Sequence, residues 1–217
     1  MFEHNRSFTG LLKEKHILLL QNGVDTTIFF PRNVKVTGDR LKFLFVARLE
    51  ECKGILILLE AWSLIQDKSR MELHIVGDGT FGPLLEERSR YSQNIFYHGA
   101  IESDELARVY RDADIFVYPS ECDTFGNVVI EALASGLYVI TSQYLKGIFD
   151  NFESMGFLEY VPRDPKTIAE RMIAIESDPK FMNIDRHSLF DHVKNNYDWS
   201  AISRKLFSSL QNLMKEN

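Results

Sequence analysis

Short apolar runs alternate with longer amphipathic segments along most of the chain. The runs that predict strands lie at residues 16–20, 43–47, 72–76, 94–98, 115–118 and 138–141. Segments that predict helices lie at 55–65, 82–87, 103–112 (with Ser103 as its cap) and 167–176, and two more follow from about residue 181. Strands that alternate with helices over short connections are typical of βαβ units. The sequence therefore predicts an α/β fold with a single Rossmann-like, doubly wound parallel sheet.

The stretch from Asp123 to Gly136 departs from this simple alternation. Every side chain from Val128 to Ala134 is apolar except Glu131, and a carboxylate on such a buried helix is unfavourable unless it is paired. Upstream, Asp123, Thr124 and Asn127 suit helix caps, and Gly126 lets another group approach the backbone closely. Free amides at a helix N-terminus attract anions. We therefore expect one pocket that offers N–H groups to phosphate oxygens and two carboxylates to hydroxyl groups. The alternative is a core helix whose single glutamate reaches a groove.

Two cations follow the first strongly buried run. Arg48 comes directly after residues 43–47, and Lys53 lies five residues further on. In doubly wound folds, ligands bind beyond the carboxyl ends of the strands, and an Arg fork with a Lys charge suits a diphosphate there. The alternative is an exposed basic pair with Glu50 and Glu51 as surface partners.

A glycine pattern, G-x-G-x-x-G, runs from Gly77 through Gly79 to Gly82. It formally matches the dinucleotide fingerprint and makes an NAD-dependent oxidoreductase a remote alternative. However, the fingerprint normally follows the first strand of its unit, and an earlier strand precedes this one. The end of the next strand also carries His98 where an acidic residue would be expected.

Composition narrows the function classes. The chain has 217 residues, which fits one globular domain or a domain with a tail, and its net charge of −6 argues against a nucleic-acid binder. Its apolar runs are much shorter than the roughly 20 residues of a membrane span. Cys52 and Cys122 make neither a disulfide framework nor a zinc pattern, which favours a reducing compartment. Glu121, Cys122 and Asp123 are adjacent on an extended segment and cannot all face one metal ion.

Three motifs carry a resemblance to a known family. Asp123 to Gly136 resembles the donor-site signature of glycosyltransferase family 4 (retaining, GT-B fold), E/D-x-F-G-x-x-x-x-E-A-x-A-x-G, with Asp123 at a position more often occupied by Glu. Residues 48–54 resemble its R-L-x-x-x-K-G motif. Residues 20–31 resemble I-P-N-G-V-D-x-x-x-F-x-P, which closes the N-terminal domain in that family, with Gln21 in place of the usual Pro. The resemblance covers nearly the whole chain and is weakest at residues 1–15 and 143–160.

This resemblance implies the C-terminal, nucleotide-sugar-binding half of a GT-B enzyme. Residues 1–40 would be a remnant of the domain junction and linker, and 41–217 the donor domain with its C-terminal helices, the last of which crosses onto the N-terminal domain. The donor would be a UDP-sugar or GDP-sugar, with no cofactor and no metal. Arg48 and Lys53 would hold the diphosphate, Glu131 the ribose hydroxyls and Asp123 a sugar hydroxyl. The remaining expected donor contacts are Gly77, Gly79, His98, Thr124, Phe125, Gly126 and Asn127.

The acceptor site of this family lies in the N-terminal domain, so we expect little or no sugar transfer by this chain alone. A separate acceptor-domain chain is the natural partner, and residues 16–20 are a candidate strand for association with it or with a second copy. The chain could come from a split gene, from a truncated gene or from excision of a longer protein. As a function, a non-catalytic module that binds a nucleotide sugar also remains open. The expected location is the cytoplasm, with peripheral contact at the inner membrane face in polysaccharide or glycolipid synthesis.

Overall fold

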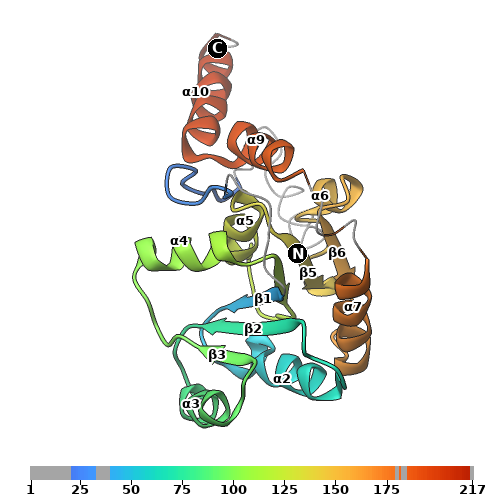
Figure 1. Cartoon of the computed structure of the whole chain (residues 1–217). Coiled ribbons are helices and arrows are strands. Elements are labelled where there is room, and N and C mark those ends of the chain that lie inside the picture. Colours follow the sequence, from blue (N-terminus) through green and yellow to red (C-terminus); the bar gives the residue numbers. More distant parts are fainter. Residues whose placement is uncertain (1–20, 33–39, 179–180, 182–184, 216–217) are drawn as a thin grey trace, which may run out of the picture.

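The fold is built on one parallel sheet whose strand order reverses in the middle. A computed structural model describes residues 21–32, 40–178, 181 and 185–215. The sheet has six strands in the order β3-β2-β1-β4-β5-β6, all parallel (Figure 1). The strands are β1 (Leu41–Val46), β2 (Met71–Val76), β3 (Ile95–Tyr97), β4 (Ile115–Tyr118), β5 (Tyr138–Ser142) and β6 (Leu158–Val161). Because the chain runs from β1 out to β3 and then returns to β4, β1 and β4 form the topological switch point.

Helices cover both faces of the sheet, as a doubly wound fold requires. Helix α2 packs against α7 on one side, while α4 and α5 lie on the other side, where α5 contacts α9 (Figure 1). Short 3₁₀ turns, η1 (Glu51–Lys53) and η2 (Gln143–Leu145), follow β1 and β5. The helices are α2 (Ile55–Leu64), α3 (Gly82–Tyr91), α4 (Ser103–Asp112), α5 (Asn127–Ala134), α6 (Asp150–Ser154), α7 (Pro165–Ser177), α9 (Arg186–Tyr197) and α10 (Trp199–Lys215).

The central strands are buried on both faces, which explains their unbroken apolar sequences. Phe43, Leu44 and Phe45 of β1 are fully buried, as is every residue of β4. Trp62 of α2 packs edge-on against Phe43, with ring centroids 6.1 Å apart. The core therefore lies along β1 and β4, directly beneath the switch point.

Most predicted elements are confirmed to within a few residues. The weakly patterned segment around residues 143–160 contains α6 and the edge strand β6, neither of which the sequence predicted. The prediction that Ser103 caps α4 is wrong, because Glu102 precedes the helix in an extended conformation and no side chain caps it. The predicted strand at residues 16–20 lies outside the described residues.

A buried carboxylate joins both flanks of the domain to the sheet. Asp114, just before β4, is 2% exposed and lies 2.5 Å from Arg32 and 3.2 Å from Arg186. Its second oxygen accepts a hydrogen bond from the Lys42 backbone amide at 3.0 Å. The segment before β1 and helix α9 are therefore held against the same point of the core.

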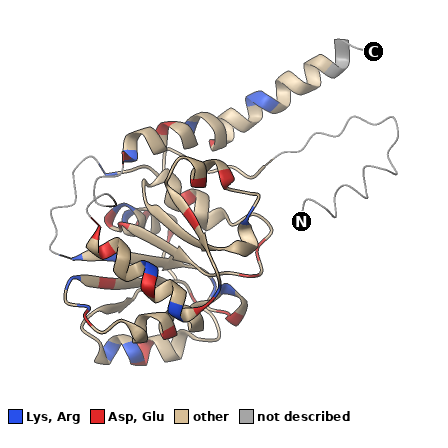
Figure 2. Ribbon diagram, turned by 90° about the vertical axis from the view of Figure 1, so that its right-hand side faces the viewer, with Lys and Arg blue, Asp and Glu red and all other residues tan. Residues whose placement is uncertain are grey.

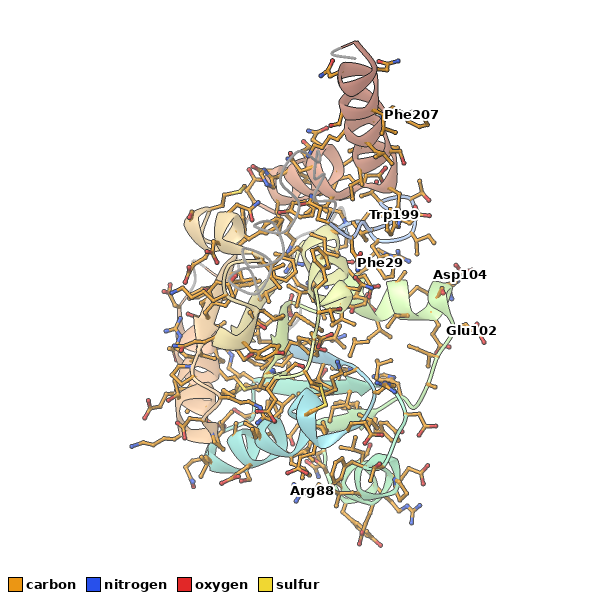
Figure 3. All side chains as sticks on the ribbon, turned by 180° about the vertical axis from the view of Figure 1, so that it is seen from behind. Phe29, Arg88, Glu102, Asp104, Trp199 and Phe207 are labelled. Atoms are coloured by element: carbon orange, nitrogen blue, oxygen red, sulfur yellow. A yellow bond between two sulfur atoms is a disulfide. The ribbon has the colours of Figure 1, made fainter. Side chains whose placement is uncertain are left out.

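The last helix extends beyond the body of the domain (Figures 1 and 2). Phe207 on α10 is 66% exposed, and Figure 3 shows its side chain pointing away from the fold. Val24 holds the start of this helix, since its carbonyl oxygen accepts a hydrogen bond from the Trp199 amide at 3.3 Å. No helix within the described ranges is long and apolar enough to cross a membrane.

Candidate functional site

The loops that follow β1 and β4 meet at the switch point and enclose a hollow of about 210 Å³. Arg48 follows β1, Lys53 lies in η1, and Asp123 follows β4, so three predicted site residues come together. The hollow is also lined by the predicted residues Thr124, Phe125, Gly126 and Asn127. Parallel strands place their carboxyl ends at one edge of the sheet, which is why residues so far apart in sequence converge here.

Asp123 and Lys53 form the central ion pair of this hollow. Lys53 Nζ lies 2.8 Å from Asp123 Oδ2, which also accepts hydrogen bonds from the Tyr118 hydroxyl and from Ser120 Oγ at 2.8 Å. Burial raises the pKa of Asp123, but the hydrogen bonds from Lys53, Tyr118 and Ser120 outweigh it and hold this pKa below its usual value. Asp123 is therefore ionised, and its Oδ1 has no hydrogen-bond partner among the described residues.

Arg48 remains available for a ligand. Its side chain is exposed and makes no hydrogen bond or ion pair with any residue that the structure describes. Glu50 accepts a hydrogen bond from Thr80 Oγ1 at 3.0 Å, and Lys53 pairs with Asp123. The structure therefore does not show the alternative arrangement in which Glu50 and Glu51 neutralise the two cations.

The start of α5 lines the same hollow. Gly126 precedes the helix at φ 83°, a left-handed conformation that favours glycine, and no side chain caps the helix. The expected capping by Asp, Thr or Asn is therefore wrong. The first amides of the helix, those of Asn127 and Val128, have no acceptor within it.

Asn22 is a site residue that the sequence analysis did not identify. Its Nδ2 donates to Asn127 Oδ1 at 2.9 Å, and it lines the hollow. The segment before the sheet thus contributes directly to the site. The N-G-V-D motif was the available signal, but it predicted only a domain junction.

Glu131 lies about one turn inside α5 and is paired with a tyrosine. The Tyr110 hydroxyl lies 3.1 Å from Glu131 Oε2 and 3.2 Å from the Val128 carbonyl oxygen. Burial raises the pKa of Glu131 to about 7, and the hydrogen bond from Tyr110 opposes only part of this shift. Glu131 lies beside the hollow on the same helix but is not one of the residues that line it.

Replacing Glu131 with Gln is expected to stabilise the fold by about 2 kcal/mol at about pH 8. The folded protein keeps the carboxyl proton up to about pH 7, whereas the unfolded chain loses it near 4.5. The folded state thus binds more protons between these values, so stability falls as the pH rises through them. Glutamine cannot ionise and avoids this loss.

Urea unfolding of Glu131→Gln and the parent at about pH 4 and pH 8 measures the effect. The two proteins should be equally stable at the lower pH. The exposed Glu87→Gln on α3 is the matched control and should show no pH-dependent gain. A Glu131→Gln protein that is less stable at both pH values would contradict the burial of this carboxylate.

Gly77 and Gly79 support the site but do not line its hollow. Gly77 has φ 130°, and a Cβ atom there would lie 1.8 Å from the Ala47 carbonyl oxygen. The glycine loop thus packs directly against the segment that carries Arg48. As the sequence indicated, it follows the second strand of the fold and not the first.

His98 follows β3, next to the glycine loop and also outside the hollow. Its Nε2 lies 3.1 Å from His74 Nδ1, and the two rings stack with centroids 5.3 Å apart. The amide of Gly77 donates to the Gly99 carbonyl oxygen at 2.8 Å, so the loops after β2 and β3 are joined. They extend the site along the edge of the sheet.

The prediction that the two cysteines form no disulfide is wrong. Cys52 and Cys122 are bonded, with Cα atoms 5.7 Å apart and a sequence separation of 70 residues. Each adjoins a site residue, since Cys52 precedes Lys53 and Cys122 precedes Asp123. The sequence separation concealed this pairing, because only the β1–β4 contact brings the two loops together.

Neighbours of the disulfide point in different directions, as expected. Glu121 pairs with Arg163 at 2.6 Å, while Asp123 pairs with Lys53. Within the described part of the chain, no group of three or more His, Cys, Asp and Glu residues is arranged to hold a metal ion.

Comparison with known proteins agrees with this geometry. The profile of the family described as Glycosyl transferases group 1 matches residues 40–178. An uncharacterized glycosyltransferase of Methanocaldococcus jannaschii is 30% identical over 183 residues, which are 82% of this chain and 46% of that protein. This chain spans about half the length of the curated relatives it matches.

Two solved structures share the fold. Sucrose-phosphate synthase from Thermosynechococcus elongatus superposes with a TM-score of 0.76 and 24% identity, over 94% of this chain and 54% of that one. The C-terminal domain of a glycosyl transferase group 1 family protein from Francisella tularensis gives a TM-score of 0.66 and 25% identity, over 82% of this chain and 100% of that one. The profile match, the relative and the GT-B architecture agree, and the chain therefore belongs to the Glycosyl transferases group 1 family.

Proposed function

We propose that this chain is the donor-binding half of a retaining glycosyltransferase of family 4, which takes a sugar from a UDP-sugar or GDP-sugar. The observation that carries this proposal is the convergence of Arg48, Lys53, Asp123 and the free amides of α5 on one hollow. Two cations and a helix N-terminus suit a diphosphate, and an ionised carboxylate suits a sugar hydroxyl.

The cations act on the charge that develops during transfer. As the bond between the sugar and the diphosphate breaks, negative charge builds on the leaving phosphate, and Arg48 and Lys53 stabilise it. Asp123 holds the Lys53 ammonium in place at 2.8 Å, so this charge is positioned before the donor arrives. No step of this scheme requires a metal ion.

The carboxylates of Asp123 and Glu131 bind hydroxyl groups of the donor. Asp123 Oδ1 accepts a hydrogen bond from the transferred sugar, and Glu131 accepts from the two ribose hydroxyls. The base lies along the loops that carry Gly79 and His98. Asn22 orients Asn127 at the helix N-terminus through their 2.9 Å hydrogen bond.

The acceptor requires a further domain. The chain spans about half the length of its relatives, so we assign acceptor binding to a second domain, in the same or a separate polypeptide. The Anabaena protein HepE, which shares the fold at a TM-score of 0.68, was solved with UDP and glucose. This supports a nucleotide sugar as the donor here.

Calorimetric titration with UDP, GDP and NAD, in the presence of a chelator, tests the proposal. We expect UDP or GDP to bind, NAD not to bind, and Glu131→Ala to weaken nucleotide binding at least about tenfold, which is about 1.4 kcal/mol. Loss of the hydrogen bonds to both ribose hydroxyls is the physical reason.

Glu87→Ala, at an exposed position outside the site, is the matched control and should bind like the parent. Binding of NAD in preference to UDP and GDP would overturn the proposal. Unchanged nucleotide affinity in Glu131→Ala would show that the ribose assignment is wrong, while binding by the parent would still support a donor site.

A further inference from the structure

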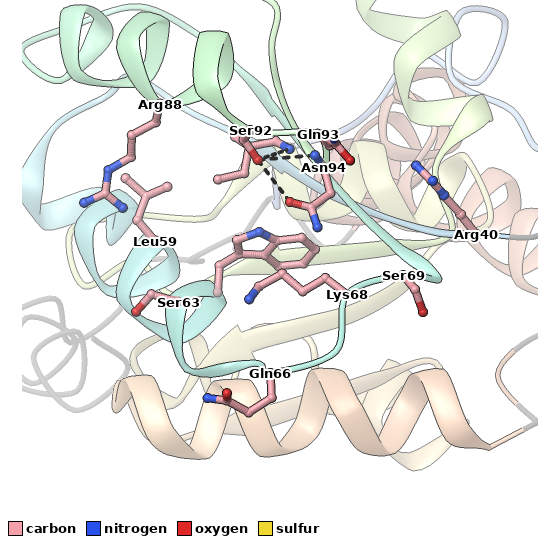
Figure 4. Close-up of a pocket in the computed structure, with 12 residues that line it drawn as sticks. Arg40, Leu59, Ser63, Gln66, Lys68, Ser69, Arg88, Ser92, Gln93 and Asn94 are labelled. Atoms are coloured by element: carbon pink, nitrogen blue, oxygen red, sulfur yellow. Dashed lines mark hydrogen bonds between the residues drawn. The ribbon is translucent and has the colours of Figure 1, made fainter.

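A second and larger hollow, of about 470 Å³, lies at the other end of the sheet (Figure 4). It is formed by three segments: Arg40, which precedes β1; residues 59–69, which lead into β2; and residues 88–95, which lead into β3. All three precede their strands, whereas Arg48 and Asp123 follow theirs. This pocket is therefore separate from the donor site, and its volume suits a small molecule.

Positive charge dominates the pocket. Arg40, Lys68 and Arg88 line it, and no Asp or Glu does. Arg88 and Arg40 stand at opposite ends, with Lys68 between them (Figure 4). Arg40 is 3.4 Å from Glu72, but Arg88 makes no hydrogen bond or ion pair with any residue that the structure describes. In a chain of net charge −6, this concentration of cations favours an anionic ligand.

Trp62, which also lines the pocket, carries a buried donor without a partner among the described residues. The Trp62 side chain is almost fully buried at 3% exposure, and its indole N–H has no hydrogen-bond acceptor among the described residues. Indole can only donate, and a buried donor without an acceptor is unfavourable by about 1–3 kcal/mol. The Trp62 side chain therefore lies against the pocket, where its fluorescence can report a ligand.

The rest of the lining is suited to hydroxyl groups. Ser63, Ser69, Gln93 and Asn94 present hydroxyls and amides, which both donate and accept. Ser92 Oγ donates a hydrogen bond to Asn94 Oδ1 at 3.0 Å and accepts one from the Ile95 amide at 3.1 Å. These two bonds fix the loop before β3. Mixed donors and acceptors beside cations match a molecule that carries hydroxyls as well as an anionic group.

We propose that this pocket binds a small phosphorylated sugar, with its phosphate held by Arg88 and Lys68 and its hydroxyls held by the amide and hydroxyl side chains. The Lys68 ammonium is already fixed at the pocket, because it donates to the Ile65 carbonyl oxygen. Burial lowers the pKa of Lys68, and a bound phosphate would oppose that shift. Nothing in this proposal depends on the nature of the donor.

Fluorescence of Trp62 provides a direct test. The chain has two tryptophans, so Trp199→Phe leaves Trp62 as the single reporter. We expect glucose 6-phosphate to change this fluorescence saturably in the presence of UDP and GDP, which together occupy the donor site. Glucose or inorganic phosphate should bind at least about tenfold more weakly, since each lacks one half of the interaction.

Arg88→Ala and Lys68→Ala should each weaken binding of glucose 6-phosphate about tenfold. The matched control is Arg90→Ala, two residues further along α3 and outside the pocket, which should bind like the parent. Circular dichroism verifies that each variant is folded.

Three results would overturn the proposal: no saturable fluorescence change, an equal loss of affinity in Arg88→Ala and Arg90→Ala, or displacement of the sugar phosphate by UDP. Equal affinity for inorganic phosphate and glucose 6-phosphate would overturn the assignment of a sugar.

Discussion

Reduction of the Cys52–Cys122 bond is expected to lower the free energy of unfolding by about 4 kcal/mol. The bond closes a loop of 70 residues, and release of such a loop greatly increases the conformational entropy of the unfolded chain. Cys122 is exposed, so a reductant has access to the bond. Urea unfolding of the oxidised protein with and without a dithiol measures the difference.

The double variant Cys52→Ser/Cys122→Ser serves as the control, because its unfolding should not respond to the reductant. We also expect reduction to weaken nucleotide binding, since the bond holds the neighbours of Lys53 and Asp123 together. Titration of two free thiols in the native protein before any reductant is added would contradict the pairing.

Replacement of Lys53 by Met is expected to weaken UDP or GDP binding about a hundredfold, which is about 2.7 kcal/mol. Methionine keeps most of the length and apolar contact of the lysine but removes the charge that we propose faces the diphosphate. The change also leaves the half-buried Asp123 carboxylate without its cation, so an uncompensated negative charge would repel the phosphates. Calorimetric titration of the variant measures the loss.

Lys166→Met is a suitable control because Lys166 is 80% exposed on α7, far in sequence from the site residues. Its nucleotide affinity should equal that of the parent. If Lys53→Met bound the nucleotide as tightly as Lys166→Met, the diphosphate would not lie against Lys53. Arg48 would then be the cation that carries the phosphate contact.

The sequence correctly predicted which residues lie at the ends of the strands, because their positions depend only on where each strand ends and on the order of the strands. The apolar runs at β1 and β4 located Arg48 and Asp123 at strand ends, and a doubly wound sheet brings such ends together. Lys53 followed from its short distance to β1. Helix α4 was predicted with the bounds that the structure shows, because burial of one face determines both its pattern and the helix. Helix α2, which is apolar on most sides, was predicted to within one residue.

Contacts between segments that lie far apart in the sequence could not be predicted from the sequence pattern. The disulfide, the hydrogen bond from Tyr110 to Glu131 and the contact of Asn22 with Asn127 each join residues more than 20 positions apart. Strand β6 lacks a continuous apolar run because it lies at the edge of the sheet, where Glu159 and Tyr160 are only partly buried. The order of apolar and polar residues within one segment does not indicate which distant segment that segment will contact.

The two arginines around Asp114 define how far the domain can be trimmed. The family profile spans residues 40–178, yet Arg32 and Arg186, which neutralise Asp114, both lie outside that span. A polypeptide cut to the profile would leave a carboxylate beside β4 that is 2% exposed in the intact fold and has lost both counterions, a defect of several kcal/mol. The segment that the family profile matches is therefore smaller than the segment that keeps Asp114 paired.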